Sequence, residues 1–353
     1  MKIAIRADGG AKIGMGHIMR TLVLAKELRK HHNKVFYICR IDSEDIPSYD
    51  AELCHKFLSD KIKEIGISDK YKKGIEKITS EGFKVCFVRE GHLLEDISTI
   101  TADILITDNY NVDENYFNKT KTMFRKTTYI DDMNLYKFNV DFLLNQNVDA
   151  EDFNYKVNDD TKLILGAKYI MLRDEFRDLP PKNIKPKAGD IMLTVGGSDP
   201  FYLTDKILSW VRDLEFNFHV VVGPSFEHGE HLKKYENNKI KLYYNANMYK
   251  IMEKCDIAIS ACGSTLYELA ACGVPTIGII IADNQAGIGK KLNSMGIIKN
   301  LGWYDKIDKE DFLINVNKLI NDYELRRTIS QRASNIVDVK GAERIAKILT
   351  GNI

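Results

Sequence analysis

The residues with the clearest chemical potential lie near the start of the chain, where a histidine follows two glycines. The segment Ile13-Gly14-Met15-Gly16-His17 connects the apolar run 2–6 to the stretch 21–28, which predicts a helix. The first amides of such a helix lack partners within it, and its positive dipole end attracts phosphate. Because imidazole is a common general base, His17 could activate water beside a bound phosphate. Alternatively, His17 only fills or caps the turn.

A second glycine turn occurs in the later half of the chain. Residues 195–200 read Val-Gly-Gly-Ser-Asp-Pro and follow an apolar run that predicts a strand. Ligands of open α/β sheets bind at the carboxyl ends of strands, so the amide of Gly197 and the hydroxyl of Ser198 could receive a phosphate. The same residues also fit a turn in which Ser198 or Asp199 caps a helix and Pro200 opens it.

The longest motif runs from Ile257 to Thr276 and predicts a strand, a glycine turn, a helix and a second strand. Ser264, after Gly263, is expected to cap the helix, whose free amides could bind a pyrophosphate. Glu268 lies about one turn into this helix and could accept hydrogen bonds from a ribose diol. The helix dipole alone also favours an acidic residue at this position.

Together these motifs resemble the PseG family, the hydrolases of UDP-2,4-diacetamido-2,4,6-trideoxy-β-L-altropyranose in pseudaminic acid biosynthesis. The resemblance covers residues 1–300 and rests on Arg6-Ala7-Asp8, on 13–25, on Gly-Gly-Ser-Asp-Pro and on 263–276. It implies an α/β GT-B fold, in which two Rossmann-like domains face a cleft. It also implies transfer of the sugar to water with inversion, which gives UDP and 2,4-diacetamido-2,4,6-trideoxy-L-altrose for surface glycans such as those on flagellin.

The same resemblance implies roles for individual residues. His17 becomes the catalytic base or water-positioning group, and Tyr110 and Asn284 match polar active-site positions. Without the family, Tyr110 is simply a residue at a strand end and Asn284 a helix cap. Arg20 and Asp8 flank the site, with a structural ion pair as their alternative role. The implied substrate-binding residues are Asp8, Gly14, Gly16, Arg20, Gly197, Ser198, Gly263, Ser264, Thr265, Glu268 and Gln285. The implied reaction needs no metal and no cofactor.

Composition limits the partners that the chain can have. Its 51 basic and 50 acidic residues leave a net charge of +1, so no basic field exists to hold nucleic acid or an anionic membrane. The six cysteines form no C-x-x-C pair and predict buried free thiols in a reducing cytoplasm. No apolar run approaches the ~18 residues of a membrane span. We therefore expect a cytoplasmic protein that binds a UDP-sugar, with a monomer favoured.

The order of apolar runs predicts two α/β domains, because strand-like and helix-like stretches alternate in each half of the 353 residues. We expect a first domain over 1–180, with an inserted segment near 42–77, and a second over 188–353 that binds UDP and carries extended C-terminal helices. The proline-containing stretch 179–189 is the expected linker. The inserted segment is either a lid or a solvated surface helix.

Three other functions remain open from the sequence. A GT-B glycosyltransferase could carry the same histidine after glycines, and a non-catalytic nucleotide-sugar sensor could keep the same binding motifs. A hydrolysing UDP-sugar epimerase would need a carboxylate pair beside the sugar, which the sequence does not identify. The chain has no G-x-S-x-G, P-loop or H-E-x-x-H pattern, which argues against the commonest serine hydrolases, P-loop enzymes and zincins.

Overall fold

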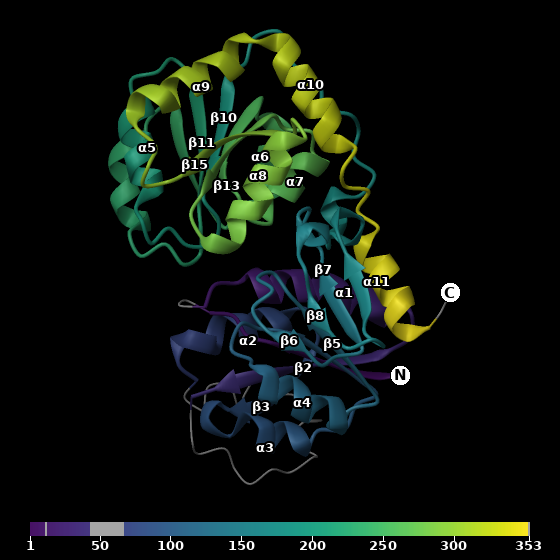
Figure 1. The fold of residues 1–353 in the computed structure, drawn as a ribbon. Coiled ribbons are helices and arrows are strands. Elements are labelled where there is room, and N and C mark those ends of the chain that lie inside the picture. The colour runs from purple at the N-terminus through teal and green to yellow at the C-terminus, as the bar shows by residue number, and fades with distance from the viewer. Residues whose placement is uncertain (11–12, 43–66, 352–353) are drawn as a thin grey trace. The chain divides into compact units, whose positions relative to one another are not determined.

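The computed structural model describes residues 1–10, 13–42 and 67–351. The chain divides into two compact units (Figure 1). The first contains Met1–Met171 and Lys340–Ile353, and the second contains Leu172–Val339. Each unit is built on its own parallel sheet, which confirms the predicted α/β class with two Rossmann-like domains.

The first unit is organised around a seven-stranded sheet in the order β3-β2-β1-β4-β5-β7-β9, and every pairing in it is parallel. Its inner strands are apolar on both faces, as a parallel sheet covered by helices requires. In β1, for example, Ile3, Ala4 and Ile5 are completely buried. The strands are β1 (Lys2–Ala7), β2 (Lys34–Ile41), β3 (Lys84–Arg89), β4 (Ile104–Asp108), β5 (Lys126–Ile130), β7 (Phe142–Asn145) and β9 (Lys162–Leu165).

Helices and short elements connect these strands. The α-helices are α1 (Gly16–Lys30), α2 (Asp69–Ser80), α3 (Leu93–Ser98) and α4 (Glu114–Met123). The 3-10 turns are η2 (Glu90–His92), η3 (Ala150–Asp152) and η4 (Ala167–Tyr169), and β6 (Lys137–Phe138) pairs with β8 (Lys156–Val157) in a small separate sheet. Helix α2 connects β2 to β3 as an ordinary crossover helix. The last part of the expected insertion near 42–77 therefore belongs to this helix. Residues 43–66 of that segment lie outside the described residues.

The second unit is organised around a six-stranded parallel sheet in the order β12-β11-β10-β13-β14-β15. Its strands are β10 (Asp190–Thr194), β11 (Asn217–Val222), β12 (Ile240–Tyr244), β13 (Ile257–Ala261), β14 (Thr276–Ile280) and β15 (Ile298–Trp303). Its helices are α5 (Leu203–Val211), α6 (Met248–Lys254), α7 (Thr265–Ala271), α8 (Ala286–Ser294), α9 (Lys309–Asn321) and α10 (Tyr323–Ser334), with 3-10 turns η5 (Asp174–Phe176), η6 (Gly229–Tyr235) and η7 (Asp283–Gln285).

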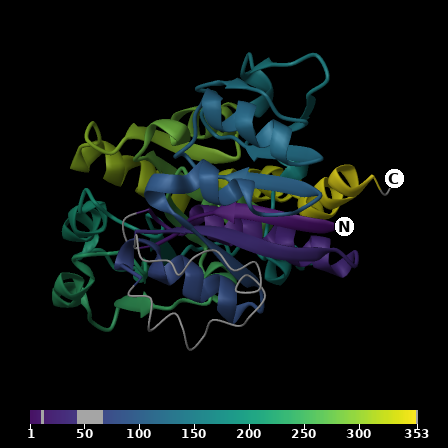
Figure 2. The ribbon, with the colours of Figure 1, turned by 90° about the horizontal axis from the view of Figure 1, so that it is seen from below.

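The C-terminal helix α11 (Gly341–Thr350) belongs to the first unit, which corrects the expected limit of the second domain at residue 353. Its apolar face, with Ile345 and Leu349, joins the core of the first sheet and contacts α1. Figure 1 and the perpendicular view in Figure 2 both place it beside the N-terminal elements. Gly341 lies so close to the backbone of Ile170 that a Cβ there would be 2.2 Å from its carbonyl oxygen. The first division between units falls at 171/172, before the expected linker.

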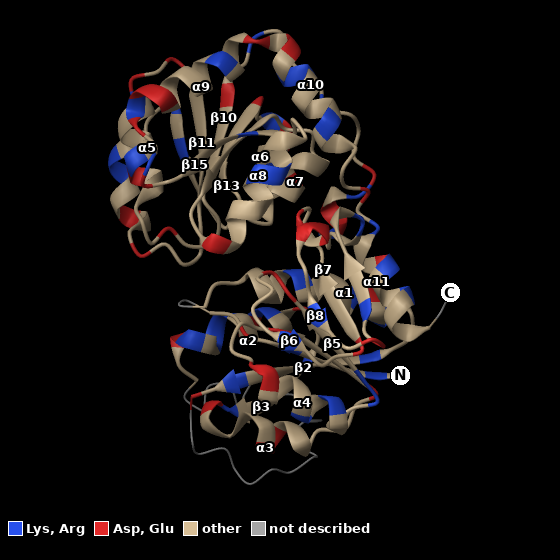
Figure 3. Cartoon of the chain, in the orientation of Figure 1, with Lys and Arg blue, Asp and Glu red and all other residues tan. Residues whose placement is uncertain are grey.

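The remaining composition-based expectations concern thiols, charge and membranes. The five cysteines within the described part of the chain are free and buried, as predicted, whereas Cys54 lies outside it. Figure 3 shows basic and acidic residues interspersed along the ribbon of each unit. Among the described helices, none has the length and apolarity to cross a membrane.

Candidate functional site

In each unit, the strand order reverses between two central strands, and there the candidate residues gather. In the first sheet, β1 and β4 are neighbours and their crossovers run to opposite sides of the sheet. Loops after such strands open a crevice at the carboxyl edge, where open α/β sheets bind ligands. The loop after β1 leads to His17, and β4 ends at Asp108. The sheet therefore brings together residues that are 91 positions apart.

The turn before His17 is shaped by backbone contacts. Gly10 and Gly14 exchange hydrogen bonds, and Gly14 has φ +83°, a conformation that glycine adopts without strain. Helix α1 then begins at Gly16, so His17 lies in its first turn as predicted. Helix α2 supports the loop from one side, because Gly74 donates a hydrogen bond to the carbonyl of Gly9. A Cβ at Gly74 would lie 2.3 Å from that carbonyl oxygen, so the close approach requires glycine.

His17 is oriented by a carboxylate. Its Nδ1 lies 2.6 Å from Oδ1 of Asp108, whose side chain is completely buried. Burial alone would raise the pKa of Asp108, but the charges of Arg20 and His17 outweigh it and lower the pKa to about 2. An ionised carboxylate can only accept, so Nδ1 carries the proton that it donates. The lone pair of the neutral ring is consequently on Nε2, the atom that a general base uses.

Arg20 fixes the same carboxylate from a second direction. Its Nε and Nη2 donate to both oxygens of Asp108 at 2.6 and 2.5 Å, and its Nη1 donates to Asp132 Oδ1 at 2.8 Å. Such two-pronged contacts define both distance and orientation. Burial lowers the pKa of Arg20, but the two carboxylates outweigh it and raise the pKa well above its usual value. Arg20 therefore supports His17 through Asp108.

Tyr110 joins this network from the loop after β4. Its hydroxyl donates to Asp132 Oδ2 at 2.8 Å, and its ring meets that of His17 edge to face with centroids 4.6 Å apart. Removal of the hydroxyl from water raises the pKa of Tyr110, and the charge of Asp132 raises it further, so the phenol stays protonated. The side chain is nevertheless 45% exposed. Tyr110 thus combines a fixed hydroxyl with an accessible ring beside His17.

The suggested pairing of Arg20 with Asp8 is wrong, because each has other partners. Asp8 accepts from Arg40 Nε at 2.7 Å and from Asn109 Nδ2 at 2.7 Å, and it is almost completely buried. These bonds connect the ends of β1, β2 and β4. Asp8 therefore has a structural role beneath the loop. At Gly14 and Gly16, by contrast, an added Cβ would have no neighbouring atom within 4 Å.

In the second unit, the Gly196-Gly197 turn follows β10, one of the two strands at the reversal of strand order. The carbonyl of Gly197 accepts from the Ser225 amide at 2.9 Å. Ser198 is exposed. The expected helix start at Pro200 is wrong, because α5 begins at Leu203. The N-cap residue is Tyr202 rather than Ser198 or Asp199, although the Asp199 carboxylate accepts from the amides of Leu203 and Thr204 at 2.8 Å each.

The other central strand of this sheet, β13, leads into the second glycine turn. Ser264 occupies the N-cap position of α7, but its side chain makes no capping hydrogen bond, which corrects the expected role. Its hydroxyl is exposed, and the partly exposed Thr265 begins the helix. A Cβ at Gly263 would lie 3.6 Å from Nε2 of Gln285, so this turn and η7 are neighbours. The Gln285 side chain accepts from the Ile281 amide at 3.1 Å.

Asn284 lies half-buried in η7, before α8 rather than at its cap.

Glu268 is already held by a cation. Arg173 Nη2 donates to its Oε1 at 2.9 Å, and Arg173 also pairs with Glu175. Burial raises the pKa of Glu268, although Arg173 opposes that shift. The Glu268 side chain remains 17% exposed. The contact with Arg173 thus orients the carboxyl group of Glu268 at the edge of α7.

Sequence reasoning missed the residues that orient the predicted ones. Asp108 ends β4, Asp132 follows β5, and Arg173 lies far from Glu268 in the chain. The only available signal was the Thr-Asp-Asn-Tyr run at 107–110, in which Asp108 adjoins the selected Tyr110. No group of three or more His, Cys, Asp or Glu side chains suited to a metal ion occurs among the described residues.

Comparison with known proteins relates this geometry to a family. Residues 191–297 match the glycosyltransferase family 28 C-terminal domain. A hydrolase from Campylobacter jejuni, named for UDP-2,4-diacetamido-2,4,6-trideoxy-β-L-altropyranose, is 25% identical over 281 residues, which cover 76% of this chain and 87% of that protein. The chain is similar to this hydrolase, whose name is that of the PseG-type enzyme. This confirms the resemblance predicted from the motifs.

Two further relatives differ in length and name. An uncharacterized protein from Methanocaldococcus jannaschii is 31% identical over 296 residues, which cover 78% of this chain but only 55% of that protein. The spore coat polysaccharide biosynthesis protein SpsG from Bacillus subtilis is 24% identical over 359 residues and matches 99% of this chain and 98% of its own length.

Solved structures establish the fold of the chain. MurG from Acinetobacter baumannii superposes with a TM-score of 0.65 at 12% identity and covers 99% of each chain. HepE from Anabaena, solved with UDP and glucose, gives 0.62 at 12% identity, again over 99% of each chain. The predicted GT-B fold is confirmed.

Proposed function

We propose that the chain is an inverting UDP-sugar hydrolase that cleaves UDP-2,4-diacetamido-2,4,6-trideoxy-β-L-altropyranose without a metal or cofactor. The observation that carries this proposal is the pair His17–Asp108, which leaves Nε2 of the imidazole as the basic atom. The name of the Campylobacter jejuni relative supports the substrate. The free thiols of the described cysteines are compatible with a reducing cytoplasm as its location.

In the proposed reaction, His17 Nε2 accepts a proton from the water that attacks the anomeric carbon. A bond forms between the water oxygen and this carbon while the bond to the UDP oxygen breaks, and the electron pair leaves with UDP. Attack on the opposite face gives inversion. Asp108 stabilises the imidazolium that forms, as a buried carboxylate does for a histidine base. Arg20 holds Asp108 in place, and Tyr110 and Asn284 are assigned to positioning the sugar.

The second unit is assigned to the nucleotide. Backbone amides at Gly197, Gly263 and Thr265, together with the Ser198 and Ser264 hydroxyls, would bind the diphosphate and stabilise the charge that develops as UDP leaves. Glu268 would accept from the ribose diol, and Gln285 would support the Gly263 turn. In the first unit, Gly14 and Gly16 would let the substrate approach the backbone. UDP is a good leaving group, so the proposal includes no protein acid.

The test follows the reaction by proton NMR with purified protein and the altrose substrate, and records both UDP release and the first anomer formed. Wild-type protein is expected to release UDP and the inverted free sugar. His17→Asn should reduce the rate by at least about a hundredfold, whereas the exposed control His92→Asn should retain it. Equal rates in wild type and His17→Asn would contradict the assigned base.

A second candidate is a GT-B glycosyltransferase, favoured by the family 28 match over residues 191–297. The SpsG relative, which aligns along its full length, is named for polysaccharide biosynthesis and also leaves a different sugar open. Saturable UDP-sugar binding without UDP release in water would favour this candidate if release begins with an added acceptor. A nucleotide-sugar sensor would bind without turnover under every condition.

A further inference from the structure

A pocket of about 380 Å³ lies at the amino ends of three strands in the first sheet, the opposite edge from Asp108. Lys2, Lys34 and Lys84, the first residues of β1, β2 and β3, all contribute to it. The complete lining is Lys2, Arg29, Asn33, Lys34, Val35, Phe36, Gly82, Phe83, Lys84, Cys86, Thr99, Ile100 and Thr101. It is therefore distinct from the candidate catalytic site, although β1 contributes to both.

The charge of this pocket is one-sided. Four lining residues are Lys or Arg, and none is Asp or Glu. Within residues 1–10, 13–42 and 67–351, no ion pair joins the side chains of Lys2, Arg29 or Lys34 to a carboxylate, although the backbone amide of Lys2 donates to Asp103 Oδ2 at 2.7 Å. This contrasts with the whole chain, whose basic and acidic residues are almost equal in number. A concave surface lined by one sign of charge concentrates ligands of the opposite sign.

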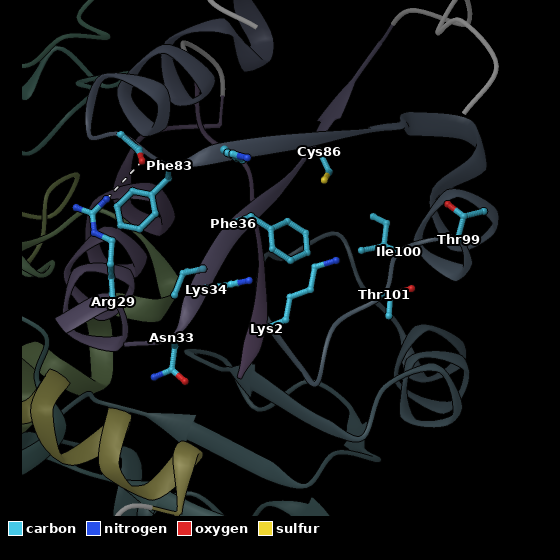
Figure 4. Close-up of a pocket in the computed structure, with 13 residues that line it drawn as sticks. Lys2, Arg29, Asn33, Lys34, Phe36, Phe83, Cys86, Thr99, Ile100 and Thr101 are labelled. Atoms are coloured by element: carbon cyan, nitrogen blue, oxygen red, sulfur yellow. Dashed lines mark hydrogen bonds between the residues drawn. The ribbon is translucent and has the colours of Figure 1, made fainter. Parts of the chain in front are cut away.

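The cations surround aromatic rings. Lys2 Nζ lies 5.4 Å from the centre of the Phe36 ring, and the Arg29 guanidinium lies 4.2 Å from the centre of Phe83. Figure 4 shows both rings among the cationic side chains, with Ile100 and Thr101 on the other side of Lys2. These cation–π contacts hold the charges in place without neutralising them. The pocket consequently offers apolar surface together with the positive charges of Lys2, Arg29 and Lys34 to the same ligand.

We propose that this pocket binds a small organic anion in which a flat apolar ring carries a phosphate or carboxylate group. Its volume is within the usual range for small-molecule sites, roughly 300–1,000 Å³. The ring would pack against Phe36 and Phe83, and the anionic group would accept hydrogen bonds from Lys34 and Lys2. A concave pocket with this lining favours a small molecule over a flat anionic membrane surface.

The test uses 1-naphthyl phosphate and 1-naphthoate as probes, with neutral 1-naphthol and inorganic phosphate as comparisons. Isoleucine methyl groups of the full chain are observed by NMR. Ile100 reports on the pocket, and Ile277, in the core of the second unit, serves as the reference. The two anionic probes distinguish a phosphate ligand from a carboxylate ligand. We expect at least one of them to shift Ile100 saturably and to leave Ile277 unchanged.

Charge reversal then tests the recognition. Lys34→Glu and Lys2→Glu are each expected to weaken binding by about tenfold or more, because hydrogen bonds to charged groups are lost. Lys162→Glu is the matched control, since Lys162 is exposed and begins β9 of the same sheet but lies outside the pocket. Equal binding of naphthol, unchanged affinity in both pocket variants, or binding of anionic vesicles but not of the probes would overturn the proposal.

Discussion

His17 and Asp108 are joined by a 2.6 Å hydrogen bond between Nδ1 and Oδ1, although His17 lies in α1 and Asp108 ends β4, 91 positions later in the chain. The bond determines which ring nitrogen carries the proton, because ionised Asp108 accepts but cannot donate. It also places a negative charge where an imidazolium would form. The order of the strands in the first sheet therefore brings together the two side chains that would take part in proton transfer.

Asp108→Asn tests this relationship. The amide can donate to Nδ1, which favours the other tautomer and places the proton on Nε2, so we expect the rate of UDP release to fall by about 10³-fold or more. Steady-state kinetics should show the loss in kcat rather than in KM. Asp113→Asn is a matched control, because Asp113 caps α4 through the Tyr116 amide and asparagine caps equally well. An Asp108→Asn enzyme with wild-type kcat would contradict the tautomer argument.

The same carboxylate makes a prediction for acid stability. The pKa of Asp108 in the folded protein is about 2, below the ordinary value of 3.8. Ionised Asp108 therefore contributes its full share to the free energy of unfolding above pH 3.8, and this share is lost as the pH falls toward 2. The stability difference between wild type and Asp108→Asn should shrink by about 2 kcal/mol between pH 5 and pH 2, measured by urea unfolding.

Asp131 provides a control of opposite sign. Burial raises its pKa to about 6, so the folded state binds this proton more tightly than the unfolded state does. The contribution of protonated Asp131 to the free energy of unfolding is therefore greatest below pH 3.8 and declines as the pH rises through 6. Wild type should therefore lose stability relative to Asp131→Asn across that interval. Parallel pH profiles for the two variants would contradict the assignment of these pKa shifts.

Tyr110→Phe separates the two contacts that Tyr110 makes. Phenylalanine keeps the edge-to-face packing on His17 but removes the hydroxyl that donates to Asp132. We expect about a tenfold loss of kcat, because one hydrogen bond to a charged group disappears. Tyr110→Ala removes the ring as well and should cost more. If both variants lose equally, the ring contributes nothing, and the hydroxyl alone accounts for the role of Tyr110.

The sequence predicted the elements of the site better than the contacts between them. The glycine turn before His17 was recognisable because Gly14, Gly16 and the following helix are local features. The partnership of His17 with Asp108 depends on β1 and β4 being neighbours, which a single sequence does not specify. For the same reason, Arg20 was considered with Asp8, whereas the folded chain pairs it with Asp108 and Asp132.

The wrong limit of the second domain and the wrong capping role of Ser264 also arise because a single sequence does not specify contacts between elements. Helix α11 was assigned to the second domain because it follows α9 and α10 in the chain. Its apolar face, including Ile345, is compatible with either core, and only packing against α1 determines its place. Ser264 likewise has the residue type of a helix cap, but its side chain makes no such bond. Local propensity therefore predicted where helices and turns occur, but not which residues or elements they contact.

The pair Arg173–Glu268 leads to a prediction for nucleotide binding. Burial raises the pKa of Glu268, and Arg173 limits that rise. If Glu268 accepts from the ribose, UDP affinity requires the ionised carboxylate and falls as the pH decreases through its pKa. Arg173→Gln removes the opposing charge, so the pKa should rise further and the affinity should decline at higher pH than in wild type. Calorimetric titration with UDP from pH 5 to pH 8 measures this shift.

Two further variants make that titration decisive. Glu268→Gln should weaken UDP binding by about tenfold and remove the contribution of this group to the pH dependence, because the amide does not titrate. Arg177→Gln is the control, since Arg177 is another arginine of the same unit and its Nη2 pairs with Asp174 rather than Glu268. A pH profile that stays unchanged in Arg173→Gln, with full affinity in Glu268→Gln, would remove Glu268 from the nucleotide site and leave the pair as a structural contact of α7.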